Sequence, residues 1–230
     1  MITTKRIQTL TSLTIALMMV LAIAVPGLEA AGGSSAPPST NPVDTAAAAY
    51  ERGLKARDKA WELEKEMESS DPATRERLAS KIDKQYEKAA RAFRSATEEN
   101  PKMYQAFSSL GYALRKTGDY DGSLAAYNEA LDINPGYVEA IEYRAEAYLG
   151  LDRLNEAKDA YLQLFREDRE RADELMTAMQ SWVEERQDNP GSLDASTVEE
   201  FTSWVEERAE VSGNTASLYT GGSEPDWTSD

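Results

Sequence analysis

Carboxylates are the reactive side chains that this sequence offers in number. It contains 41 Asp and Glu residues but no histidine and no cysteine. Nucleophilic and general-base chemistry by imidazole or thiol is therefore excluded, as are the zinc, copper and haem sites that need those ligands. The composition still permits a pair of carboxylates for acid/base or glycosidic catalysis.

The positions of the acids argue against such a pair. In EKEMESSD (64–71) and EERQD (184–188) they fall between apolar residues of helical spacing, where a solvated helix face explains them. No Gly-rich phosphate-binding loop is present in the sequence, because Gly118 and Gly150 fall at expected turns between helices. We therefore expect no enzymatic activity, no cofactor and no metal.

The charge balance narrows the class of partner. Asp and Glu outnumber the 25 Lys and Arg residues, giving a net charge of −16. Nucleic acid and anionic lipid are not expected as partners, because phosphate binding relies on clustered positive charge. The acidic excess fits either a basic protein partner or a role in solubility.

Residues 1–30 have the layout of a secretory signal peptide. Lys5 and Arg6 precede an apolar run over 13–25, and small residues up to Ala30 suit a cleavage site. The alternative is an uncleaved membrane anchor, but the run is shorter than the roughly 20 residues that span a bilayer. We expect a periplasmic or secreted protein, in contact with a membrane only if this segment is retained.

The rest of the chain divides into three parts that differ in composition. Residues 31–44 are rich in Gly, Ser, Pro and Ala without an apolar period, which predicts a disordered linker. From 45 to about 211 the apolar spacing is helical almost throughout. Residues 212–230 return to Gly, Ser, Thr and Asp and are predicted to form a disordered tail.

A repeat of 34 residues organises the helical part. Small and aromatic residues recur at this interval, as in the pairs Phe107/Ile141, Gly111/Ala145 and Tyr127/Tyr161. Small residues suit places where two helices approach closely, and large ones fill the space beside the next hairpin. A fixed period near 34 with two helices per unit predicts a stacked helical array.

The stretch YQAFSSLGYALRKTGDYDGSLAAYNEALDINP (104–135) resembles a tetratricopeptide repeat (TPR). VEAIEYRAEAYLGLDRLNEAKDAYLQLF (138–165) resembles a second, although it carries Arg144 where a leucine is usual. YEKAARAFRSATEENP (86–101) resembles the second helix of a preceding unit. The resemblance implies an all-α fold with a short TPR-type array over 45–168, containing repeats at 104–137 and 138–168.

The first unit departs from the family. Its expected small residue, Gly53, lies 24 residues too far from the second helix, so we predict an extended hairpin over 45–99 with helices at 45–69 and 72–99. With about 12 extra residues per helix, the hairpin would project roughly 18 Å beyond the array. Two further helices within 169–211 are predicted to cap the other end of the array.

The resemblance also implies a concave groove lined by the first helix of each hairpin. The matching positions are predicted to bind a peptide or helix of another protein: Tyr50, Leu54, Arg57, Ser108, Tyr112, Arg115, Glu139, Glu142, Glu146 and Leu149. Exposed Tyr and Leu would anchor such a ligand, and the three glutamates favour a partner that carries Lys or Arg. The basic and asparagine clamp by which some TPR proteins hold a C-terminal carboxylate is not matched.

These features predict an exported TPR scaffold or adaptor for protein–protein interaction in the cell envelope. The alternative is a self-associating structural helical protein. In that case Trp61, Trp182, Trp204 and the long hairpin would form an oligomer interface.

Overall fold

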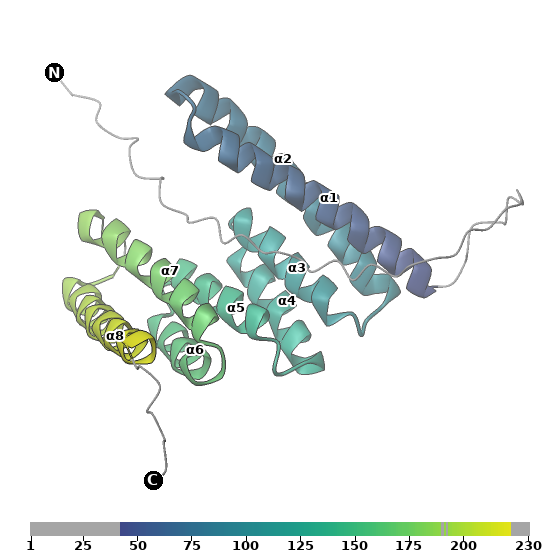
Figure 1. Cartoon of the computed structure of the whole chain (residues 1–230). Coiled ribbons are helices and arrows are strands. Elements are labelled where there is room, and N and C mark those ends of the chain that lie inside the picture. The colour runs from purple at the N-terminus through teal and green to yellow at the C-terminus, as the bar shows by residue number, and fades with distance from the viewer. Residues whose placement is uncertain (1–41, 190, 192, 222–230) are drawn as a thin grey trace, which may run out of the picture. The chain divides into compact units, whose positions relative to one another are not determined.

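The computed structural model describes residues 42–189, 191 and 193–221. Within these ranges the chain forms helices and no strand, in two compact units, an N-terminal unit (42–137) and a C-terminal unit (138–221) (Figure 1). The N-terminal unit contains α1 (Pro42–Glu68), α2 (Pro72–Glu99), α3 (Tyr104–Lys116) and α4 (Tyr120–Ile133). The C-terminal unit contains α5 (Val138–Gly150), α6 (Leu154–Glu167), α7 (Arg169–Asp188) and α8 (Ala195–Gly221). The all-α fold is confirmed.

Local chemistry specifies the turn between α1 and α2. The Asp71 side chain accepts hydrogen bonds from the backbone amides of Ala73 (3.0 Å) and Thr74 (3.2 Å), and Pro72 occupies the first turn of α2. The guanidinium of Arg75 donates to the carbonyls of the last two residues of α1. The end of one helix and the start of the next are thus both satisfied within the hairpin.

The long hairpin packs like the shorter one that follows it. A Cβ on Gly53 would lie 2.5 Å from Cδ1 of Phe93, and one on Gly111 would lie 2.8 Å from Cδ1 of Tyr127. In both hairpins a glycine of the first helix therefore admits an aromatic ring of the second. The α1–α2 hairpin is an elongated version of the repeat unit.

The extra length forms its own small core. α1 and α2 have 27 and 28 residues, against 13 and 14 in α3 and α4, and their joined end extends past α3 and α4 (Figure 1). The buried residues of this part are Ala60, Leu63, Leu78, Ile82 and Tyr86, with Tyr112 of α3 packed against them. Burial of these side chains holds the extension together.

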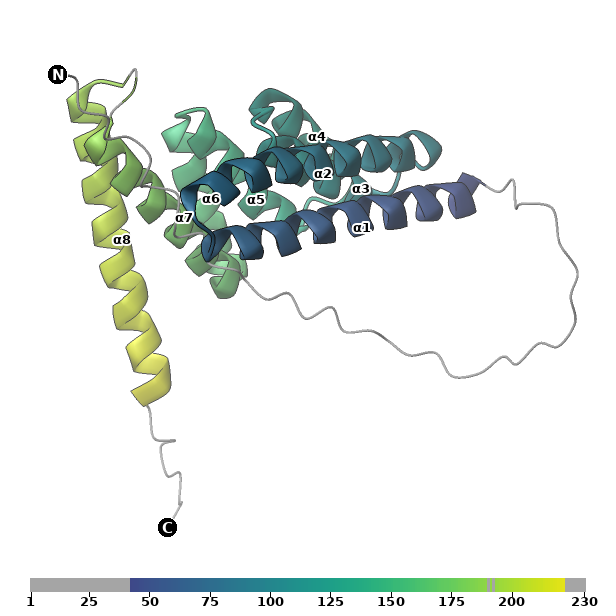
Figure 2. The same cartoon turned by 90° about the horizontal axis from the view of Figure 1, so that it is seen from above.

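The C-terminal unit begins with a second short hairpin. Its turn places Asp152 at φ 57°, 34 residues after Gly118 at φ 81°. The aspartate is one of the few non-glycine residues that tolerate this left-handed conformation, and its carboxylate pairs with Arg186 at 2.7 Å. α7 packs on α5 and α6, and α8 packs on α7 (Figure 2).

The last helix is longer than predicted. α8 continues to Gly221, so residues 212–221 are helical where the sequence predicted a tail. Ser212 donates to Asp173 Oδ1 at 2.9 Å and accepts from Arg169 at 3.4 Å, which fixes α8 to the start of α7.

The first helix also extends beyond its predicted bounds, because α1 includes Pro42–Asp44 of the predicted linker. Residues 1–41, which include the predicted signal peptide and most of the predicted linker, lie outside the described residues, as do residues 222–230. No helix in the described ranges has the length and apolarity needed to cross a membrane.

Candidate partner-binding faces

In the N-terminal unit the predicted groove residues of α1 and α3 lie together. The hydroxyl oxygen of Tyr50 is 3.4 Å from that of Ser109, next to the predicted position 108. Leu54 and Tyr50 pack on the same buried cluster, which includes residues of α1, α2 and α3. We call this surface the α1/α3 face, defined by Tyr50, Leu54, Arg57, Trp61, Tyr112 and Arg115.

Trp61 contacts two residues of this face, and the groove prediction did not include it. It is 37% exposed, yet its indole N–H donates to the Tyr112 hydroxyl at 2.8 Å, and the two rings meet edge-on at 6.1 Å between centroids. The Arg57 guanidinium lies 4.1 Å from the centroid of the indole. The sequence held a signal for this role, because Trp61 follows Arg57 by one helical turn.

Buried and paired side chains lie beneath the face. Tyr86 is fully buried and meets Tyr112 edge-on at 5.9 Å, and burial raises the pKa of its phenol, so it stays neutral. Lys116 pairs with Glu64 of α1 at 2.7 Å and lies over the Tyr86 ring. Trp61 and Tyr112 are thus held in place before any ligand binds.

Two other predicted positions of this unit differ in exposure. Arg115 is half-buried, with its guanidinium 5.4 Å from the Tyr112 ring centroid. Ser108 is buried. The α1/α3 face is therefore made chiefly by aromatic and arginine side chains.

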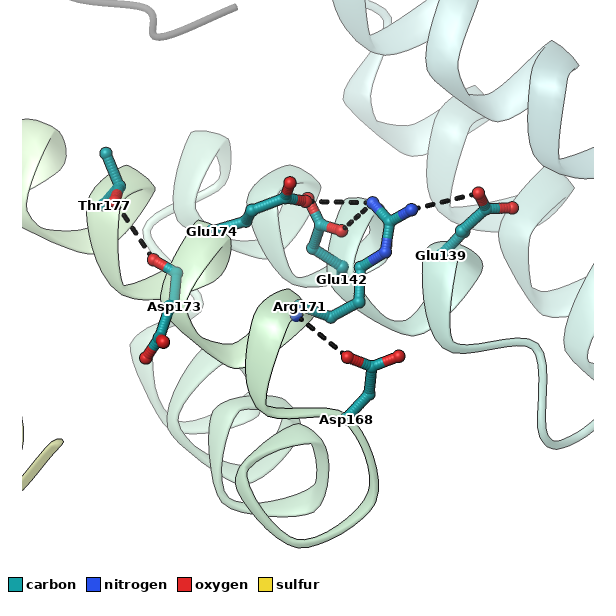
Figure 3. Close-up of polar contacts among 7 residues, drawn as sticks. All are labelled: Glu139, Glu142, Asp168, Arg171, Asp173, Glu174 and Thr177. Carbon is teal, nitrogen blue, oxygen red and sulfur yellow. Dashed lines mark hydrogen bonds and ion pairs between the residues drawn. The ribbon is translucent and has the colours of Figure 1, made fainter. Parts of the chain in front are cut away.

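The α5 glutamates are already engaged by an arginine of the same chain. Arg171 of α7 donates to Glu142 at 2.7 Å and to Glu139 at 3.0 Å, and also to Glu174 of α7 at 2.9 Å (Figure 3). Glu142 is 3% exposed, in contrast to the open groove position that the resemblance implied. The Arg171 backbone amide donates to Asp168, which caps α7.

This environment changes the ionisation of Glu142. Burial, together with the negative charge of Glu146, raises the pKa of Glu142 to about 8 against the opposing pull of Arg171. Burial works against the charge of Arg171 too, but its hydrogen bond and ion pair with Glu142 raise the pKa of the guanidinium. Near neutral pH the Glu142 carboxyl therefore carries less negative charge than an ordinary glutamate, and it still accepts a hydrogen bond from Arg171.

The other predicted positions on α5 are also less exposed than groove positions would be. Glu139 and Glu146 are half-buried, whereas Leu149 is buried and its carbonyl accepts from the Trp182 indole at 3.0 Å. Sequence reasoning missed Arg171, because the residue lies in α7, 29 positions from Glu142. No cluster of potential metal ligands occurs in the part of the chain that the structure describes.

Comparison with known proteins agrees with this architecture. Two sequence profiles described as tetratricopeptide repeat match residues 84–138 and 114–180. The chain contains TPR repeats. Among curated proteins, none matches the sequence.

Two solved TPR structures match part of the chain at low TM-score. The first TPR of Spaghetti (RPAP3), bound to the HSP90 peptide SRMEEVD, is 18% identical with a TM-score of 0.41, covering 57% of this chain and 94% of that one. The TPR2B domain of yeast Sti1 in its pHsp70 complex is 13% identical with a TM-score of 0.38, covering 72% and 98%.

The TPR match reaches further than the two repeats seen in the sequence. The second profile ends at residue 180, inside α7, and so includes Arg171. The first half of α7 is therefore TPR-like in sequence as well as a cover for α5. α1 and α3 are the first helices of successive hairpins, and their outward stripes meet in one face.

The alternative hypothesis of a self-associating protein assigned Trp61, Trp182 and Trp204 to an oligomer interface. One of these tryptophans is buried and so is not available to a second copy. Trp182 is 7% exposed and hydrogen-bonded within the C-terminal unit. Trp204 packs edge-on against Tyr161 and stacks with Phe201. Trp61 is the most exposed of the three.

Proposed function

We propose that the α1/α3 face binds a peptide or helix of another protein, and that the chain acts as a TPR adaptor. The observation that carries the proposal is the exposed indole of Trp61, fixed by Tyr112 and Arg57. Exposed aromatic anchors on a rigid support contribute strongly to binding, because little side-chain freedom is lost when the ligand arrives.

The proposal does not require a basic partner. Glu139 and Glu142 are neutralised in part by Arg171, so they offer less negative charge than the sequence suggests. The partner would instead place an apolar or aromatic side chain against Trp61. Polar groups of the same partner would meet the guanidinium of Arg57 at the rim.

We further propose that the adaptor works in the cell envelope after export. The support is the charged, apolar and small-residue pattern of residues 1–30. Mass spectrometry of the N-terminus of the mature protein tests this step. Cleavage after Ala30 is the expected result, and an intact N-terminus in the membrane fraction would refute it.

Photo-crosslinking tests the binding face directly. A photoreactive residue in place of Lys65, which is exposed on α1 one helical turn after Trp61, would be used in the mature chain in envelope extracts. A partner crosslinked there should be lost in a Trp61→Ala variant. Leu162→Ala is the matched control, because Leu162 has the same 37% exposure and lies on α6.

The outcomes separate the possibilities. Loss of the crosslinked partner with Trp61→Ala and its retention with Leu162→Ala support the proposal. Equal crosslinking in both variants would place binding elsewhere. Crosslinks only between copies of the chain would favour the self-associating alternative.

A further inference from the structure

Two carboxylates of α5, one carboxylate of α7 and the guanidinium of Arg171 meet where α5 contacts α7. Arg171 contacts Glu139, Glu142 and Glu174 within 3.0 Å, and its own side chain is only 14% exposed (Figure 3). Glu142, with 4% of its side chain exposed, is the innermost of the three. A guanidinium carries one positive charge, so full ionisation leaves an excess of negative charge at this contact.

Charged and titratable groups of α5 and α7 act on the contact around Glu142. On α5 they are Glu139, Tyr143 and Glu146, and on α7 they are Arg171 and Glu174. α6 also packs on α5, and the residues that it buries are Leu154, Ala157, Ala160, Tyr161 and Leu164, none of which is charged at neutral pH.

The protonation state of Glu142 determines how stable the contact between α5 and α7 is. A protonated carboxyl keeps the hydrogen bond from Arg171 and removes one negative charge from a poorly hydrated site. An ionised carboxylate gains attraction to Arg171 but is repelled by the neighbouring carboxylates and loses its hydration. Carboxylates that share a site this closely titrate as a coupled group.

We propose that the contact between α5 and α7 is a pH-sensitive joint, in which ionisation of the buried Glu142 carboxyl loosens α7 from α5. The joint is closed most firmly in mildly acidic solution and opens more often as the pH rises past neutrality. It does not involve α1 or α3, so it stands independently of the proposed partner-binding face.

The sign follows from linkage. The pKa of Glu142 is raised from 4.5 to about 8 in the closed state, and in an opened state the hydrated carboxyl would regain its ordinary value. Opening then releases one proton between these two pKa values. The opening constant is expected to rise about tenfold per pH unit within this window and to level off above pH 8.

The structure supplies a reporter of the joint. Trp182 is on α7, and its indole N–H donates to the carbonyl of Leu149 at the end of α5. Separation of the two helices would break this bond and expose the ring. A chain that keeps Trp182 as its sole tryptophan reports opening by a red shift of its emission.

Amide hydrogen exchange of α7 between pH 6 and 9, corrected for the intrinsic pH dependence of exchange, measures the opening constant. The parent is expected to show a rise of about tenfold per pH unit up to pH 8. Glu142→Gln, which mimics the protonated carboxyl, is expected to show none. Glu184→Gln, an exposed change on the same helix, should behave like the parent.

Two results would overturn the proposal. One is the same pH dependence in the parent and in Glu142→Gln. The other is a Glu142 carboxyl that titrates below pH 6, read from its ¹³C shift in the parent chain. The second measurement decides the matter even if Glu142→Gln fails to fold.

Discussion

The close contact between Gly53 and Phe93 predicts that Gly53→Ala lowers the free energy of unfolding of the parent chain. In a chain with a smaller side chain at position 93, the same substitution is expected to raise it. Alanine at position 53 would place Cβ 2.5 Å from Cδ1 and 2.9 Å from Cζ of the Phe93 ring. Ordinary carbon contacts are about 3.5–4.0 Å, so the ring must move by about 1 Å. Phe93 is fully buried and has little room to do so.

The magnitude combines two opposing terms. Overpacking of this kind costs about 1–3 kcal/mol. Replacing glycine by alanine within a helix stabilises by about 1 kcal/mol. The 2.5 Å approach places the overpacking cost in the upper part of this range, at about 2–3 kcal/mol, so we expect Gly53→Ala to lower the free energy of unfolding by about 1–2 kcal/mol.

A Phe93→Leu background should reverse the effect. The shorter, flexible side chain can turn away from position 53, so only the helix-propensity gain remains. Gly53→Ala is then expected to stabilise that background by up to about 1 kcal/mol. The exposed change Ala48→Gly in α1 measures the propensity difference in the same helix and serves as the control.

Urea unfolding followed by far-UV circular dichroism provides the four free energies. A parent chain that is unchanged or stabilised by Gly53→Ala would contradict the packing of the long hairpin. So would an equal loss of stability in the Phe93→Leu background. Either result would mean that α1 does not approach α2 as a repeat helix does.

Three further predictions concern the C-terminal unit. Asp152→Ala should cost about 1–2 kcal/mol in thermal unfolding, through the φ of 57° and the lost pair with Arg186, whereas Asp152→Gly should cost less than about 1 kcal/mol. The raised pKa of Glu142, about 8, means that the parent loses stability relative to Glu142→Gln as pH rises from 4.5 to 8, by about 3 kcal/mol at pH 7 in urea unfolding. Hydrogen bonds from the Ser196 hydroxyl and Thr197 hold the pKa of Asp194 at about 2, so the cap of α8 should persist in acid and fail only as pH falls toward 2, seen in the exchange of the Thr197 amide.

The spacing of residue types in the sequence was sufficient to predict the helices, because the start and the buried face of a helix depend on residues that are close in sequence. Asp71 and Pro72 start α2 at the predicted residue, and the 3.6-residue period locates its buried stripe. The long interval between the small residues Gly53 and Ala89 was enough to indicate an elongated hairpin. Spacing was insufficient after residue 211, where Gly, Ser and Thr lower helix propensity but helix α8 continues.

The α1/α3 face was partly predictable for the same reason. Arg57 and Tyr112 lie on outward stripes that the period assigns without knowledge of their neighbours. The hydrogen bond between Trp61 and Tyr112 spans 51 residues, and no local pattern encodes it. The sequence therefore indicated which stripes would face outward but not which ring would be the exposed anchor.

Exposure of a repeat position depends on the helix that follows it, and this explains the change in the expected partner. A TPR motif fixes which side of α5 carries Glu139 and Glu142, but α7 determines whether that side stays open. Arg171 neutralises part of the acidic set, and burial raises the pKa of Glu142 to about 8. A count of glutamates at groove positions thus overestimates the negative charge that a partner meets. The same burial that removes Glu142 from the binding surface makes the α5–α7 contact responsive to pH.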